Sequence, residues 1–132
     1  MELRKKMGIY EFTKETKRWP DWERDGKSAL LDSHYHYFVI MDIHDEYYEG
    51  FMFSTKPYPN NVLLRSEHFE AGGFPFKPSY FLTVPLKKFH HLKTNPEPVG
   101  WLSQIGKAYI EAHAKGPTQT WDDYVKGFLE ST

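Results

Sequence analysis

Short apolar runs, separated by turn residues, follow one another along the first two thirds of the chain. Strands are predicted over residues 8–12, 34–43, 47–57, 62–69 and 79–92. The last of these contains Pro85, which cannot donate a ladder hydrogen bond and should interrupt the strand. Closely spaced strands joined by short turns favour an antiparallel meander or a small β-barrel.

After about residue 98 the apolar residues take the period of a helix. One helical face within residues 98–114 carries Val99, Leu102, Gly106, Tyr109, Ile110 and His113. Thr120 then has the character of an N-cap, and Asp123 suits a helix N-terminus. The face that follows carries Trp121, Tyr124, Val125, Phe128 and Leu129. We therefore predict a single, mainly β domain with an irregular segment at 1–33, a barrel core at 34–94 and two helices within 98–130.

The composition narrows the classes of protein. A chain of 132 residues fits one domain with a core of its own. It has no cysteine, which excludes disulfides and thiolate metal sites. No apolar stretch reaches the roughly 20 residues of a membrane span, and no apolar segment of a secretory signal follows the N-terminal basic residues. We expect a cytoplasmic protein without membrane partners. The net charge of -1 means that any nucleic-acid binding needs a local basic patch.

Two histidines open the strongest predicted strand. His34 and His36 are two residues apart, so on a strand they project from the same face. A metal site is one interpretation. Asp42 is the nearest downstream acid that would project from the same face of the strand as the two histidines. However, Asp42 lies about 20 Å from His36 along an extended strand, because each residue rises about 3.3 Å. The sequence therefore predicts no metal ion and no cofactor, with His34 an ordinary strand residue.

Three segments together resemble the MazF/PemK-like toxins. Residues 36–57, "HYFVIMDIHDEYYEGFMFSTKP", resemble the part of the family in which an Arg-Pro pair opens an apolar strand and Thr or Ser ends the next. Residues 76–92, "FKPSYFLTVPLKKFHHL", resemble its Lys-Pro-Ser segment. Residues 99–112, "VGWLSQIGKAYIEA", resemble its closing Gly-x-Leu-Ser before a helix. The likeness extends over residues 34–114.

The resemblance implies an SH3-like barrel, a homodimer, and metal-independent endoribonuclease activity on single-stranded RNA. It also implies a cognate antitoxin that occupies the RNA groove. An alternative is a non-catalytic SH3-like binding module, or an inactive fold relative, that recognises a protein or nucleic-acid partner.

RNA cleavage through the 2′-hydroxyl needs a base, an acid and a group that steadies the phosphorane. Carried over position by position, His36 stands at the family's arginine, and Ser54 and Thr55 at its hydroxyl. Histidine can act as acid or base near neutral pH but clamps phosphate less well than arginine. Lys56 and Arg65 are candidate phosphate contacts.

The stretch "LKKFHHLK", residues 86–93, is a local basic patch with Phe89 between its charges. Lys87 and Lys88 are predicted to contact RNA phosphates while aromatic rings stack on bases. The competing interpretation is a sheet edge that lysines protect from pairing with another chain.

Overall fold

The computed structural model describes residues 3–13, 35–70, 79–92, 94 and 96–131. His34 and the remainder of the segment 14–34 lie outside the described residues. The strands are β1 (Gly8–Thr13), β2 (Tyr35–Ile43), β3 (Tyr47–Ser54), β4 (Asn61–Leu64), β5 (Ser79–Leu82), β6 (Leu86–Phe89) and β7 (Gly100–Trp101). The helices are the 3-10 helix η2 (Ser66–His68) and the α-helices α3 (Gln104–His113) and α4 (Trp121–Ser131). Within the described residues, no helix is long and apolar enough to cross a membrane.

The described strands form one antiparallel sheet of seven strands in the order β4-β5-β3-β2-β1-β7, with β6 also paired to β3. The mainly β fold with two C-terminal helices is thus confirmed. The sheet is open rather than a closed barrel, because β4 and β7 are not paired with each other. Among the described residues, the bridge of Phe69 with Leu102 joins the chain beyond β4 to the chain beyond β7.

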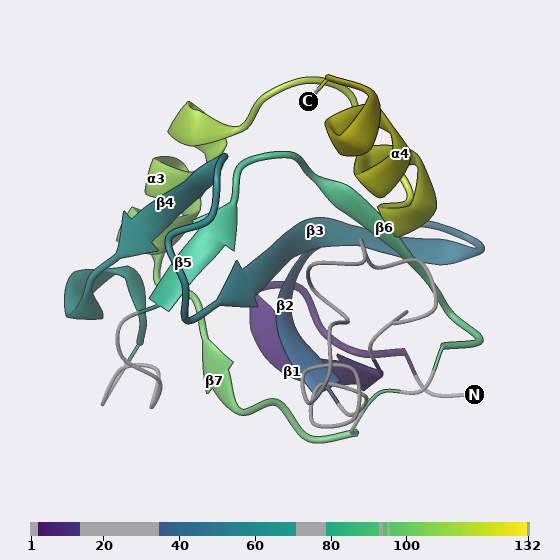
Figure 1. Cartoon of the computed structure of the whole chain (residues 1–132). Helices are drawn as coiled ribbons and strands as arrows, with labels where there is room; N and C mark the ends of the chain where they lie inside the picture. The colour runs from purple at the N-terminus through teal and green to yellow at the C-terminus, as the bar shows by residue number, and fades with distance from the viewer. Residues whose placement is uncertain (1–2, 14–34, 71–78, 93, 95, 132) are drawn as a thin grey trace.

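Pro85 interrupts the last predicted strand, as expected. β5 pairs with the end of β3 and β6 with its beginning (Figure 1). Beyond Leu82 the Thr83 N–H donates to the carbonyl of Asn60 at 2.8 Å, which continues the pairing of β5 with β4. One strand of the sequence pattern therefore becomes two short strands along the same partner.

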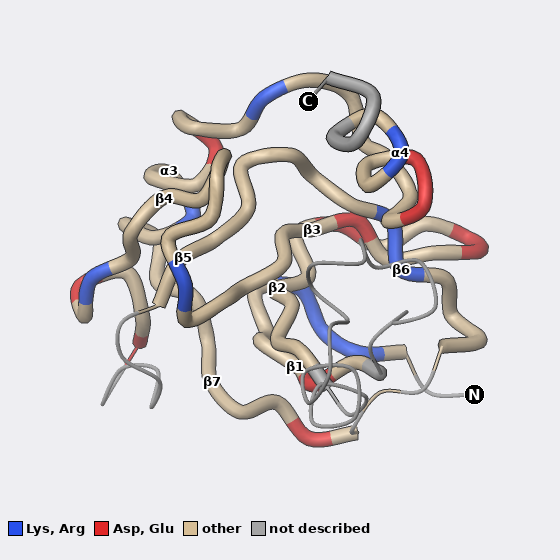
Figure 2. Tube along the Cα trace, viewed as in Figure 1, with Lys and Arg blue, Asp and Glu red and all other residues tan. Residues whose placement is uncertain are grey.

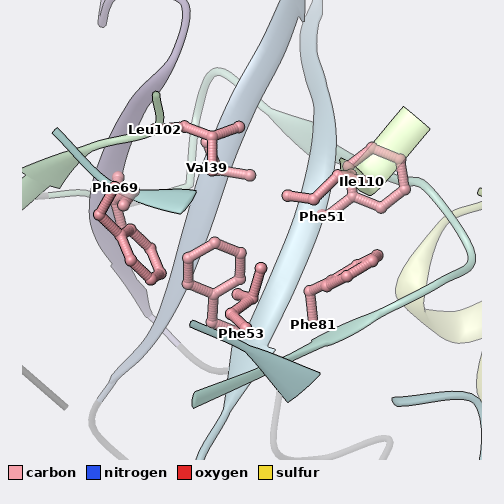
Figure 3. Close-up of a cluster of buried hydrophobic side chains, with 9 residues drawn as sticks. Val39, Phe51, Phe53, Phe69, Phe81, Leu102 and Ile110 are labelled. Carbon is pink, nitrogen blue, oxygen red and sulfur yellow. The ribbon is translucent and has the colours of Figure 1, made fainter. Parts of the chain in front are cut away.

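Apolar side chains on the two faces of the sheet form two core clusters. We call the first the α3-side core; its members are Ile9, Val39, Phe51, Phe53, Leu64, Phe69, Phe81, Leu102 and Ile110 (Figure 3). We call the second the α4-side core; its members are Tyr10, Phe12, Phe38, Ile40, Tyr48, Leu82, Leu86, Trp121 and Val125. Because both faces of the central strands are covered, β2 is apolar almost throughout rather than strictly alternating.

Helix α3 begins later than the helical pattern predicts. Residues 98–103 are not helical, because the N–H groups of Val99 and Leu102 donate to the carbonyls of Ile9 and Met7. Ser103 is the N-cap, and its hydroxyl accepts from the Gly106 N–H at 3.0 Å. The predicted helical start at residue 98 is therefore wrong, since the backbone N–H groups there bond to the β1 segment instead of within a helix.

Two further segments differ in extent from the prediction. The strand predicted over 8–12 forms as β1 and lies between β2 and β7 in the sheet, so the segment 1–33 is not irregular throughout. The strand predicted over 62–69 ends at Leu64, and η2 follows it. Helix α4 begins at Trp121 as predicted, and the Thr120 hydroxyl accepts from the Asp123 N–H at 3.1 Å.

Candidate functional site

His36 lies within the sheet rather than at its surface. It is on β2, opposite Phe12 of β1, and only 8% of the residue is exposed. The register of β2 with β3 ends at the pair of Tyr37 with Phe53, and Ser54 pairs with Tyr80 of β5. The described pairing thus does not bring His36 and Ser54 together, and the burial of His36 keeps its imidazole away from a polyanionic substrate.

The chain turns away from the sheet directly after β3. The Ser54 hydroxyl oxygen accepts a hydrogen bond from the Lys56 N–H at 3.1 Å. Thr55 and Lys56 are exposed, and the Lys56 ammonium lies 6.0 Å from the centroid of the Tyr58 ring. Ser54 therefore has the role of a turn residue, whereas Thr55 and Lys56 are accessible to a ligand.

Arg65 is exposed at the beginning of η2. Its backbone N–H donates to Nδ1 of His68 at 2.9 Å. The described contacts of Arg65 thus organise the turn between β4 and η2. Its side chain is in a position to contact solvent, as a phosphate-binding residue would be.

The two lysines predicted to bind phosphate point in opposite directions. Lys88 is fully buried, opposite Tyr48 of β3, so the prediction that it contacts RNA is wrong. Strand alternation places Lys87 on the other face, where it is half-buried and its ammonium lies 4.8 Å from the centroid of the Tyr47 ring. That distance is within the range of a cation–π interaction.

Four rings follow one another beside Lys87. His44 stacks on Tyr47 with centroids 4.5 Å apart, Tyr47 meets the edge of Phe89 at 6.2 Å, and Phe89 stacks on His91 at 5.9 Å. His91 is exposed and the other three are half-buried. We call this set the ring series. A run of partly exposed rings with a cation beside it is an arrangement on which unpaired bases can stack.

The β2–β3 hairpin carries a second group of polar side chains next to the ring series. His44 Nε2 lies 2.8 Å from Glu49 Oε1, and one ligand atom from each of Asp42, His44 and Glu49 lies within 4.8 Å of the others. A hydrogen bond from Lys6, whose ammonium is 3.2 Å away, is the main cause of a lowered pKa of Asp42. The Thr118 hydroxyl donates a hydrogen bond to the other oxygen of Glu49.

This hairpin group can do two kinds of chemistry. An imidazole held by a carboxylate is an acid/base pair, since the carboxylate orients the ring. An imidazole with two carboxylates is also a donor set that divalent transition metals accept.

Sequence reasoning missed this group because a bulge assembles it. The pairing shifts by one residue between Ile40 and Asp42, so that Asp42 comes opposite Glu49. Asp42 is thus far from His36, as the strand length predicts, but it has His44 as another partner. The signal in the sequence is Asp42-x-His44, the same i, i+2 spacing that drew attention to His34 and His36.

Figure 2 places the basic part of β6 beside acidic positions of β3, in agreement with the pairing of Lys87 with Glu49.

No family model matches the chain, and no curated protein or solved structure is significantly similar to it. The geometry of the site is therefore the basis for the function proposed below.

Proposed function

We propose that this protein binds single-stranded RNA on the ring series, and that it is an endoribonuclease toxin of the MazF/PemK type. The observation that carries the proposal is the continuous series of four rings with the Lys87 ammonium over Tyr47. Bases of any sequence have a face that can stack on such rings. Lys87 contributes a positive charge that can pair with a phosphate or lie over an aromatic ring.

Cleavage needs an acid/base group that the RNA can reach. His44 fits this role better than His36, because it is partly exposed and Glu49 holds it at 2.8 Å. In the proposed reaction the His44 imidazole takes the proton of the 2′-hydroxyl, and the 2′-oxygen attacks the adjacent phosphorus. The bond to the 5′-oxygen then breaks, and that oxygen takes a proton from water, which gives a 5′-hydroxyl on one fragment and a 2′,3′-cyclic phosphate on the other. The exposed groups at the end of β3, Thr55 and Lys56, are available to contact the phosphate backbone.

The resemblance extends the proposal to fold and partners. The Phe69–Leu102 bridge between the two ends of the sheet supports a relation to SH3-like barrels. A cytoplasmic homodimer and a cognate antitoxin that covers the RNA surface complete the proposal. Light scattering of the purified chain tests the dimer, and growth after induction tests toxicity.

The direct test of binding uses a fluorescent single-stranded RNA and fluorescence anisotropy. Stacking on one ring is typically worth about 1–3 kcal/mol, so Tyr47→Leu should weaken binding by roughly 5- to 150-fold. Tyr124→Leu is the matched control, because Tyr124 is also a half-buried tyrosine but lies on α4. Equal affinities of the Tyr47 variant and the wild type would rule out the ring series as the binding surface.

The test of cleavage uses the same RNA with and without EDTA. Wild type should release fragments with 2′,3′-cyclic ends in both conditions, and His44→Ala should not. RNA that stays bound but intact over a broad pH range would favour the alternative, a non-catalytic binding module. The burial of His36, the residue at the family's arginine position, is the observation that favours this alternative.

A further inference from the structure

The β2–β3 hairpin brings one imidazole and two carboxylates to a single point. We infer that Asp42, His44 and Glu49 bind a divalent transition-metal ion, with water completing its coordination. An ion bound there would occupy the His44 imidazole that the proposed cleavage uses as its base, so the inference rests on the geometry of the hairpin and not on that cleavage, and it can be tested without RNA.

The backbone holds the two carboxylates together against their repulsion. Because of the bulge after Ile40, Asp42 and Glu49 are cross-strand neighbours. Like charges that face each other across two strands are destabilising. A cation between them removes this repulsion; the Lys6 ammonium lies 3.2 Å from Asp42, and Lys87 of β6 is the neighbour of Glu49 on the strand's other side.

The distances suit an ion after small side-chain adjustments. Ligand atoms on one ion lie about 2.0–2.2 Å from it, and hence roughly 3–4 Å from each other. One donor atom of each residue already lies within 4.8 Å of the other two. A donor set of nitrogen and oxygen without sulfur suits zinc, manganese, cobalt or nickel. Since all three residues are at least partly exposed, water can fill the remaining positions.

Two contacts from outside the group hold the ligands in place. The Thr118 hydroxyl, which reaches the hairpin from the segment before α4, donates to the Glu49 oxygen that does not face His44. The Tyr47 ring stacks on the His44 imidazole with an angle of 22° between the rings. Outer contacts of this kind orient metal ligands and raise affinity.

The charge of the hairpin also attracts cations. Asp45 and Glu46, both exposed, occupy its tip. Lys6 competes with an ion for Asp42, because its ammonium lies 3.2 Å from the carboxylate. Removal of this ammonium should therefore strengthen metal binding, whereas at a site elsewhere on the chain it would have no effect.

The experiment is titration of the full, metal-free chain with ZnCl₂ and with MnCl₂, followed by calorimetry. One ion should bind per chain, and either His44→Ala or Glu49→Gln should abolish the signal. Thr118→Val should weaken binding by about 10-fold, the usual effect of losing an outer contact. Lys6→Met should increase affinity. His91→Ala is the matched control, because His91 is an exposed histidine near the hairpin that does not belong to the group.

Circular dichroism first establishes that each variant is folded. The inference is overturned if neither ion binds at millimolar concentration. It is also overturned if the His44 and Glu49 variants bind as wild type does, or if His91→Ala loses binding to the same extent. Because no RNA is present, these outcomes leave the proposed RNA binding untouched.

Discussion

Gly106 and Gly127 lie in different helices and should respond oppositely to alanine. Gly106 is buried at the beginning of α3, where a Cβ atom would lie well inside van der Waals contact of the His68 carbonyl oxygen and 2.8 Å from Leu102 Cδ1. The His68 carbonyl cannot retreat easily, because it accepts from the Ser103 N–H at 2.9 Å. At Gly127 a Cβ atom would meet nothing within 4 Å.

The two effects of alanine at Gly106 have opposite signs. Replacing glycine by alanine within a helix typically stabilises by about 0.5–1 kcal/mol. Forcing an extra carbon into a packed site costs about 1–3 kcal/mol, more when the opposing atom belongs to the backbone. We therefore expect Gly106→Ala to lower the free energy of unfolding by about 1–2 kcal/mol, and Gly127→Ala to raise it by about 0.5–1 kcal/mol.

Thermal unfolding followed by circular dichroism measures both changes. For 132 residues the unfolding entropy is about 0.28 kcal/mol/K, so 1 kcal/mol corresponds to about 3.6 °C in Tm. Gly106→Ala should lower Tm by about 4–7 °C and Gly127→Ala should raise it by about 2–4 °C. If Gly106→Ala raised Tm as much as Gly127→Ala, the close approach of α3 to η2 would be refuted.

Three other predictions concern turns and caps. Burial lowers the pKa of His68 below its ordinary 6.5. The free energy of unfolding should therefore be highest above pH 6.5 and decrease as the pH falls below it, because the unfolded state then binds the proton more readily. Urea unfolding at several pH values should show a smaller decrease for His68→Gln. Ser103→Ala removes the α3 N-cap and should cost about 1 kcal/mol in urea unfolding, unlike Ser66→Ala at an exposed position. Asn60 has φ of 70°, so Asn60→Ala should lower Tm more than Asn60→Gly does.

The amino-acid sequence alone determined much of the local structure. Short apolar runs and turn residues located β1 to β6, except for the end of β4, together with the interruption at Pro85 and the hairpin between β2 and β3; they did not predict β7. The spacing of apolar residues after Thr120 located α4, because its cap and its buried face are both local features. These features depend on interactions between residues close in sequence, which a pattern can show.

Tertiary structure decided what the pattern could not. The backbone of residues 99–102 has a helical pattern but pairs with β1, because hydrogen bonds to a distant strand outweigh a weak local preference. Lys87 and Lys88 are alike in sequence, yet strand alternation leaves Lys87 partly exposed and buries Lys88 completely. The group of Asp42, His44 and Glu49 depends on a one-residue bulge and on Thr118, which is 69 residues from Glu49. No local sequence pattern predicts that these residues come into contact, because the packing of the whole sheet sets the strand register and the position of the segment that carries Thr118.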